Sequence, residues 1–227
     1  HVDGGVILII VLFAAIFVIA AIFSHLAAKK RREEMGLLAA RLGLTFNPES
    51  DYNLARRFGF LDRLAQGQNR YAFNILSGRY QEHEISAFDY HYETKSRDSK
   101  GRTQTHHHYF SCFVLTLPRV FPELVITREG WLSKIAQAFG YDDIDFESAE
   151  FSRSFCVRSK DRKFAYDICH ARMMEYLLAH RDLNIEIDGD ALALAFDSRL
   201  AVGQIEGNLQ RVASIRALFP EYLFTAA

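Results

Sequence analysis

The chain has 227 residues, a formal net charge of −1 and a mean hydropathy of −0.06, which are the averages of an ordinary soluble domain. With 49% hydrophobic and 13% aromatic residues it is too apolar to be disordered. A pI of about 6.8 argues against nucleic acid as a partner, because general nucleic-acid binding needs a strongly basic face.

The apolar residues are concentrated near the N-terminus. Val6–Phe23 is an uninterrupted apolar run, and Val6–Ala28 contains no Gly, Pro or formal charge. As a helix this stretch is about 34 Å long, enough for the hydrocarbon core of a bilayer. It is apolar on every side, whereas a helix of a soluble domain carries an apolar stripe. The sequence therefore predicts a single transmembrane helix.

A basic cluster follows this run at once: Lys29, Lys30, Arg31 and Arg32. The positive-inside rule then places the C-terminal domain in the cytoplasm and the N-terminus outside, in an inner or plasma membrane. Basic residues after the run also argue against cleavage as a signal peptide. A second interpretation is contact with anionic lipid, worth about 1 kcal/mol per basic residue.

The predicted domains are an anchor with its basic flank, residues 1–32, and a cytoplasmic domain, residues 33–227. The domain carries 23 basic and 27 acidic residues, a net charge of −4. An acidic stretch near residue 143 allows two sub-lobes, 33–143 and 144–227. The three cysteines, Cys112, Cys156 and Cys169, form no C-x-x-C motif and stand in apolar contexts, so we expect buried free thiols in a reducing compartment.

In the first half of the domain, Glu33–Leu42 continues the membrane helix up to Gly43, and Ser50-Asp51 caps a short helix that reaches about Phe58. A region rich in aromatic and β-branched residues follows and predicts strands. We expect them at Ala72–Ser77, Glu84–Thr94 and Thr105–Leu117, with a polar loop at Lys95–Thr103. Pro118 is expected to end the third strand, before a strand at Leu124–Thr127 and a helix at Trp131–Phe139.

The second half predicts a strand at Phe151–Arg158 and a helix from Asp161 to about His180. Asp188-Gly189 predicts a hairpin turn between strands Asn184–Ile187 and Ala191–Phe196, and a last helix covers Gln204–Phe219. Strands cluster and helices segregate, so the fold class is α+β: a transmembrane helix followed by a mainly antiparallel sheet, as one domain or two small α/β lobes.

Three short motifs occur in the order Asn74-Ile75-Leu76-x-Gly78, Phe88-Asp89-Tyr90-x-Tyr92 and Ile144–Ser148. They resemble an uncharacterised bacterial family of membrane-anchored proteins. The pattern Phe151-x-x-x-Phe155-x-Val157-x-Ser159-x-Asp161, followed by a helix and a hairpin, is similar to a wider domain family of unknown function. The motifs span most of residues 70–200. The resemblance implies an anchored cytoplasmic α+β domain and brings no activity or catalytic residues.

The candidate metal ligands are His106 and His108, which share one face of a strand, with His91 on the opposing strand. Zn²⁺ or Cu²⁺ would suit two or three imidazoles. Solvated histidines beside a polar loop are the stronger interpretation, because nothing in the sequence fixes a third ligand. We therefore expect no cofactor. Asp89 is expected to pair with Arg79 or His91.

Signatures of nucleotide binding, of a nucleophile elbow and of kinases are absent from the sequence. The leading hypothesis is a non-enzymatic scaffold or accessory subunit of a larger membrane complex, of respiratory or photosynthetic type. The expected partners are membrane lipid and other subunits, contacted through Phe13, Phe17 and Phe23 and through the loop residues Lys95, Arg97, Lys100 and Arg102. The alternatives are a metalloenzyme that uses His91, His106 and His108 with Asp89, and an adaptor that binds anionic lipid.

Overall fold

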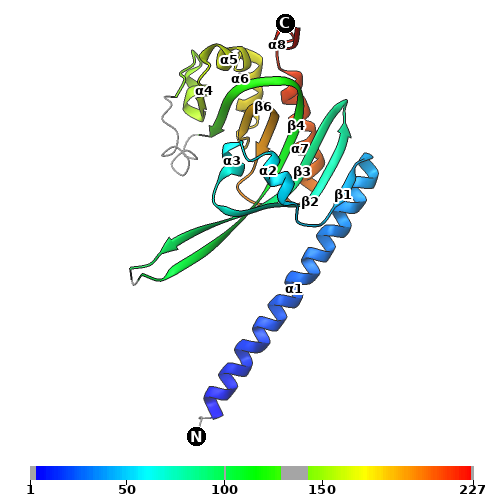
Figure 1. Cartoon of the computed structure of the whole chain (residues 1–227), viewed down its shortest axis with the longest axis vertical. Coiled ribbons are helices and arrows are strands. Elements are labelled where there is room, and N and C mark those ends of the chain that lie inside the picture. Colours follow the sequence, from blue (N-terminus) through cyan, green and yellow to red (C-terminus); the bar gives the residue numbers. More distant parts are fainter. Residues whose placement is uncertain (1–3, 100, 129–142, 226–227) are drawn as a thin grey trace.

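The computed structural model describes residues 4–99, 101–128 and 143–225, and Figure 1 shows them as a long helix that joins a folded body. The helix, α1, spans Gly4–Leu42. The body contains a six-stranded antiparallel sheet with helices on its faces. The predicted class, α+β with an N-terminal apolar helix before an antiparallel sheet, is confirmed.

The strands follow the order β1-β2-β3-β4-β5 across the sheet, and β6 pairs with β4. Their bounds are β1 Thr45–Asn47, β2 Gln68–Tyr80, β3 His83–Arg97, β4 Thr103–Arg128, β5 Phe155–Arg158 and β6 Ile185–Ala195. The 26-residue β4 organises the sheet, because it pairs first with β3 and later with β5, while β6 follows its other edge. This one sheet carries strands from both sides of residue 143, and the division into sub-lobes stays a prediction.

Two apolar cores lie on opposite faces of the sheet. The larger core packs the C-terminal part of α1, through Met35 and Leu38, against the sheet together with the helices of the second half. The smaller core packs Phe58 and Leu64 against aromatic residues of β3 such as Tyr90. The helix bounds are α2 Tyr52–Arg57, α3 Asp62–Ala65, α4 Ala149–Ser154, α5 Arg162–Ile168, α6 Ala171–Ala179, η2 Val202–Gln204, α7 Ile205–Ala217 and α8 Tyr222–Thr225.

Two breaks that the sequence predicted inside the sheet are absent from the described strands. Pro118 does not end its strand, since β4 runs on to Arg128, and the Asp188-Gly189 hairpin turn is instead part of a continuous β6. The β4–β6 register shifts on either side of the pair Phe121 and Gly189. Where the hydrogen-bond ladder is irregular, fewer backbone N–H donors are needed, so proline, which has none, is tolerated. Gly189 adopts a positive φ of 55° at the same irregularity.

Two predictions in the second half were wrong in detail. Phe151–Arg158 is not one strand, because its first half belongs to α4, whose first turn Ser148 caps by accepting a hydrogen bond from the Phe151 N–H. The helix predicted from Asp161 to His180 is two helices, α5 and α6, separated at Cys169. The helix predicted at residues 131–139 lies outside the described residues.

The end of the β3–β4 hairpin, residues 94–99 and 101–106, forms a two-stranded arm. Pairing with β2 ends at Glu93, and pairing with β6 begins only at Cys112, so residues of the arm pair across the hairpin, as Lys95 does with Thr105. Figure 1 shows the arm and α1 projecting from the same side of the body, with the C-terminus at the opposite end.

Candidate functional site: the sheet face beside the membrane helix

One face of β3 and β4 carries most of the polar chemistry near the anchor. The register pairs Asp89 with Ser111 and Glu93 with His107, so these residues and the intervening His91 share a face. Arg31 of α1 contacts this face at Asp89. The site is therefore assembled from the end of the predicted transmembrane segment and from two central strands.

Arg31 and Asp89 form a buried two-point ion pair. The Nε and Nη2 atoms of Arg31 donate to the two carboxylate oxygens of Asp89, each at 2.9 Å, and Nη1 donates to the Leu200 carbonyl at 2.7 Å. Asp89 is 1% exposed and also accepts from Asn74 Nδ2 and Ser111 Oγ, each at 2.9 Å. Arg31 is therefore the partner of Asp89, in place of Arg79 or His91, which the sequence predicted. One residue of the basic flank thus has a structural role.

A cleft lies where α1 leaves the body. It has a volume of about 860 Å³, with one wall formed by α1 from Ser24 to Arg32. The other wall contains the rings of Tyr71, Phe73 and Tyr109, and the Arg199 guanidinium lies 5.6 Å from the centroid of the Tyr109 ring. The cleft therefore combines aromatic rings with arginines at the predicted membrane surface.

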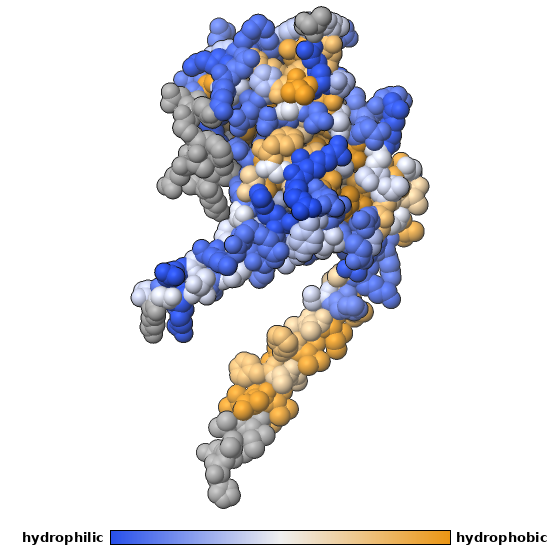
Figure 2. All heavy atoms as spheres, viewed as in Figure 1, coloured by the Kyte–Doolittle hydropathy of each residue, from blue (hydrophilic) through white to orange (hydrophobic). Residues whose placement is uncertain are grey.

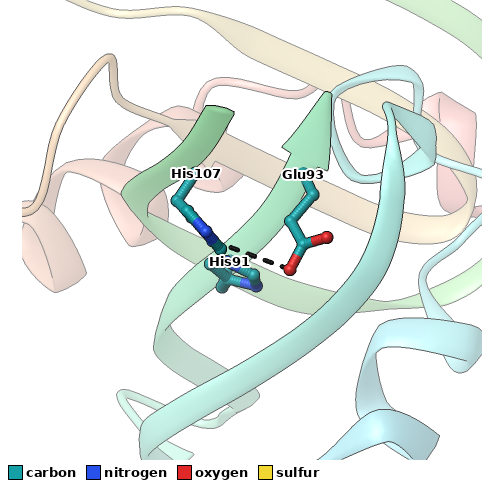
Figure 3. A group of neighbouring side chains, drawn as sticks. All are labelled: His91, Glu93 and His107. Carbon is teal, nitrogen blue, oxygen red and sulfur yellow. Dashed lines mark hydrogen bonds and ion pairs between the residues drawn. The ribbon is translucent and has the colours of Figure 1, made fainter. Parts of the chain in front are cut away.

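Next to this cleft, His91, Glu93 and His107 form a cluster at the base of the arm (Figure 3). His91 Nε2 lies 3.1 Å from His107 Nδ1, which lies 3.6 Å from Glu93 Oε1. The Tyr71 and Tyr109 rings contact the His91 ring at centroid distances of 4.5 and 4.8 Å. Burial lowers the pKa of His91, which favours a neutral imidazole.

The structure does not bring His106 and His108 to His91. His108 Nε2 hydrogen-bonds Thr94 Oγ1 at 2.8 Å, and His106 Nε2 hydrogen-bonds Ser96 Oγ at 2.7 Å. The two histidines share a face, as predicted, but it is the face opposite His91. The hairpin register decides this, because a slip of one residue exchanges the faces.

The remaining residues of the basic flank are exposed. Lys29 and Lys30 lie near Glu33 and Glu34 one helical turn on, at 3.9 and 3.8 Å. Such exposed pairs contribute little to stability, so these lysines stay accessible to solvent or lipid headgroups. Arg32 is exposed and lines the cleft.

The predicted partner contacts lie on the two projecting elements. Phe13, Phe17 and Phe23 are 68%, 76% and 68% exposed on α1. Lys95 and Arg97 are exposed on the arm. Arg102 pairs with Asp98 at 3.1 Å, and Lys100 lies outside the described residues. Figure 2 shows the contrast between the apolar surface of α1 and the hydrophilic arm.

A second polar cluster surrounds Glu186. The carboxylate accepts from the backbone N–H groups of Asp62 and Arg63, so it caps α3, whose own N-cap, Leu61, offers no polar side chain. The adjoining cavity measures about 20 Å³, about the size of one water molecule and too small for a substrate. Burial raises the pKa of Glu186 to about 8.

We expect Glu186→Gln to flatten the pH dependence of stability. The carboxyl titrates near 4.5 when unfolded and near 8 when folded, so the wild type loses unfolding free energy as pH rises from 4.5 to about 8. The slope reaches at most about 1.4 kcal/mol per pH unit. Urea unfolding at pH 5.5, 6.5 and 7.5 measures it. Glu82→Gln, at a 90% exposed side chain, should keep the wild-type slope. Equal slopes for Glu186→Gln and the wild type would contradict the expectation.

The cysteines are buried free thiols, as predicted. Burial raises the pKa of Cys112 and of Cys169 far above the ordinary value. Burial, aided by a hydrogen bond from Cys156 Sγ to Asp143, raises the pKa of Cys156 to about 12. None of the three is therefore activated as a nucleophile.

Three residues of this face are not predicted from the sequence: Arg31 as the partner of Asp89, His107 as the partner of His91, and Asn69 beside both His91 and Glu93. Asp89 carried a usable signal, because an acidic residue between Phe88 and Tyr90 on a buried strand requires a cationic partner. Nothing local distinguished His107 from its two neighbours.

No model of a known protein family matches the chain, and no curated protein matches it. Among solved structures, it is similar to the crystal structure of the mycobacterial trehalose monomycolate transport factor A, TtfA. The TM-score is 0.61 and the identity 13%, over 85% of this chain and 96% of that chain. The likeness shows a shared fold.

Proposed function

We propose that the protein is a non-enzymatic accessory subunit that α1 anchors in an inner or plasma membrane, with its N-terminus outside and its domain on the cytoplasmic side. The observation that carries this proposal is the continuity of α1. Its N-terminal part is apolar and wholly exposed, and its C-terminal part is buried in the domain core. A partner that holds the helix in the membrane would therefore also orient the domain.

Two further observations support a role in assembly. The Arg31–Asp89 pair fixes the helix to the sheet at the point where the basic flank begins. The raised pKa values of the three thiols do not favour a nucleophilic thiolate. The cavity beside Glu186 has room for about one water molecule and not for a substrate. A tethered domain from which an apolar helix, α1, and a polar arm project is better suited to contact with another protein than to turnover of a substrate.

The proposal extends to the class of complex in which the protein is a subunit. The similar fold belongs to a protein named as a transport factor. That name supports a membrane transport assembly in preference to the respiratory or photosynthetic type predicted from the sequence. The proposed partner contacts the exposed phenylalanine side chains of α1 and the arm at the same time.

A photocrosslinking experiment tests the proposal in native membranes. Phe13 and Phe17 lie one turn apart, and Ile22, nine residues from Phe13, lies on the opposite side of α1. A photoreactive phenylalanine at position 13 or 17 should give a discrete protein adduct, and the same group at position 22 should give much less. In mild detergent the protein should migrate above the mass of one chain with its bound detergent.

Migration as a free monomer, with no adduct from position 13, 17 or 22, would overturn the proposal. An adduct of equal yield from both sides would show random contact in the membrane and would also count against a specific partner. Positions 13 and 22 lie on opposite sides of α1, and both sides are exposed and apolar.

A further inference from the structure

The cluster at the base of the arm has the spacing of a metal site. Three ligand atoms, His91 Nε2, His107 Nδ1 and a Glu93 oxygen, lie within 4.8 Å of one another, at 3.1 and 3.6 Å for the two closest pairs. In a tetrahedral site with bonds of about 2.0–2.1 Å, ligand atoms lie about 3.3 Å apart. Two of the three pairs therefore lie within a few tenths of an ångström of this spacing, and the third, His91 with Glu93, lies within 4.8 Å.

Asn69 orients two of these ligands from behind. His91 Nδ1 lies 3.1 Å from the Asn69 carbonyl, so this nitrogen carries a proton and donates it to that oxygen, which leaves the lone pair on Nε2. The Asn69 side-chain amide donates to Glu93 Oε1 at 2.7 Å. Histidine ligands of metals characteristically donate their second nitrogen to a carbonyl or carboxylate in this way.

Access and charge also suit a cation. The His107 side chain is 52% exposed and the Glu93 side chain 15%, so an ion can enter from solvent and keep a water ligand at its fourth position. His91 is 1% exposed and lies between the rings of Tyr71 and Tyr109, at centroid distances of 4.5 and 4.8 Å, so its ring is held in place by packing.

We propose that His91, Glu93 and His107 bind one Zn²⁺ ion at the base of the arm. The ion takes the place of the proton that His107 Nδ1 donates to His91 Nε2 and binds both nitrogens and the Glu93 carboxylate. It links β3 to β4 at the last position where β2 still supports the hairpin. Zn²⁺ would therefore fix the direction of the arm relative to the body.

The test uses the full chain in detergent, without an affinity tag and freed of metal. Zn²⁺ is titrated by calorimetry, and Co²⁺ serves as a probe because its visible spectrum reports tetrahedral coordination. We expect one equivalent to bind and to raise the melting temperature. His107→Ala and Glu93→Gln should each weaken binding at least about tenfold. Asn69→Gly should do the same, and glycine is chosen because it readily adopts the positive φ of 49° that Asn69 has.

His106→Ala is the matched control, because His106 neighbours His107 on the opposite face and bonds Ser96 instead. It should bind Zn²⁺ as the wild type does. Loss of binding in His106→Ala, unchanged binding in His107→Ala, or no binding at micromolar Zn²⁺ would each overturn the proposal. The crosslinks from α1 are independent of this result, so failure of one proposal is distinguishable from failure of the other.

Discussion

Replacing Arg31 with leucine is expected to lower the free energy of unfolding by about 3–5 kcal/mol. The change leaves the carboxylate of Asp89, which is 1% exposed, without its counter-charge and with only the neutral donors Asn74 and Ser111. Chemical unfolding of the full chain in detergent, followed by circular dichroism, measures the loss. Because the domain would be held less firmly to α1, proteolysis of the chain between α1 and the domain should also be faster.

Arg32→Leu is the matched control, since Arg32 is the adjacent basic residue and is exposed. We expect it to change stability by less than about 0.5 kcal/mol. Adding Asp89→Asn to Arg31→Leu should recover part of the loss, because the amide removes the unpaired buried charge. Equal stability of the Arg31 and Arg32 variants would show that the buried pair contributes nothing.

The second large effect is expected at Gly67. This residue has a φ of +64°, and an added Cβ would lie 2.3 Å from the Glu93 carbonyl oxygen and 2.6 Å from the Tyr92 ring. Gly67→Ala therefore combines an unfavourable backbone conformation with displacement of β3, at a total cost of about 2–5 kcal/mol. The unfolding free energy measures this cost. Because Glu93 must move, Zn²⁺ affinity should fall as well.

Gly43→Ala separates the two causes. Gly43 has a similar φ of +69°, but an added Cβ would have nothing within 4 Å. This variant should lose only the conformational part, about 1–2 kcal/mol. If Gly67→Ala were no more destabilising than Gly43→Ala, the close approach of Gly67 to β3 would be energetically irrelevant.

The sequence predicted the elements with strong local signals. Asp51 caps α2 by accepting from the N–H groups of Asn53 and Leu54, and Asp161 caps α5, both at predicted helix starts. A cap depends on contacts within one turn, so it can be inferred from neighbouring residues. The apolar run of α1 is equally local, because length and composition alone identify a helix that can cross a membrane.

The failures depend on contacts between distant segments. Pro118 and Gly189 are tolerated inside long strands only because β4 and β6 shift register against each other, which neither segment reveals alone. The choice of His107 over His106 and His108 rests on the hairpin register, and the partner of Asp89 lies 58 residues away in the membrane helix. Most of the candidate site therefore required the assembled sheet.

In the proposed membrane arrangement, the shared direction of α1 and the arm would restrict the angles at which the protein can stand in a bilayer. The arm reaches toward the N-terminal end of α1 as the two diverge from the body (Figure 1). Tipping the molecule toward the arm would push Lys95 and Arg97 into hydrocarbon, at about 2.5–3.5 kcal/mol for each charge. In the proposed membrane arrangement, the arm would therefore limit the tilt of α1. The partner proposed above would then meet a domain already held near one inclination, which would reduce the rotational entropy lost on docking.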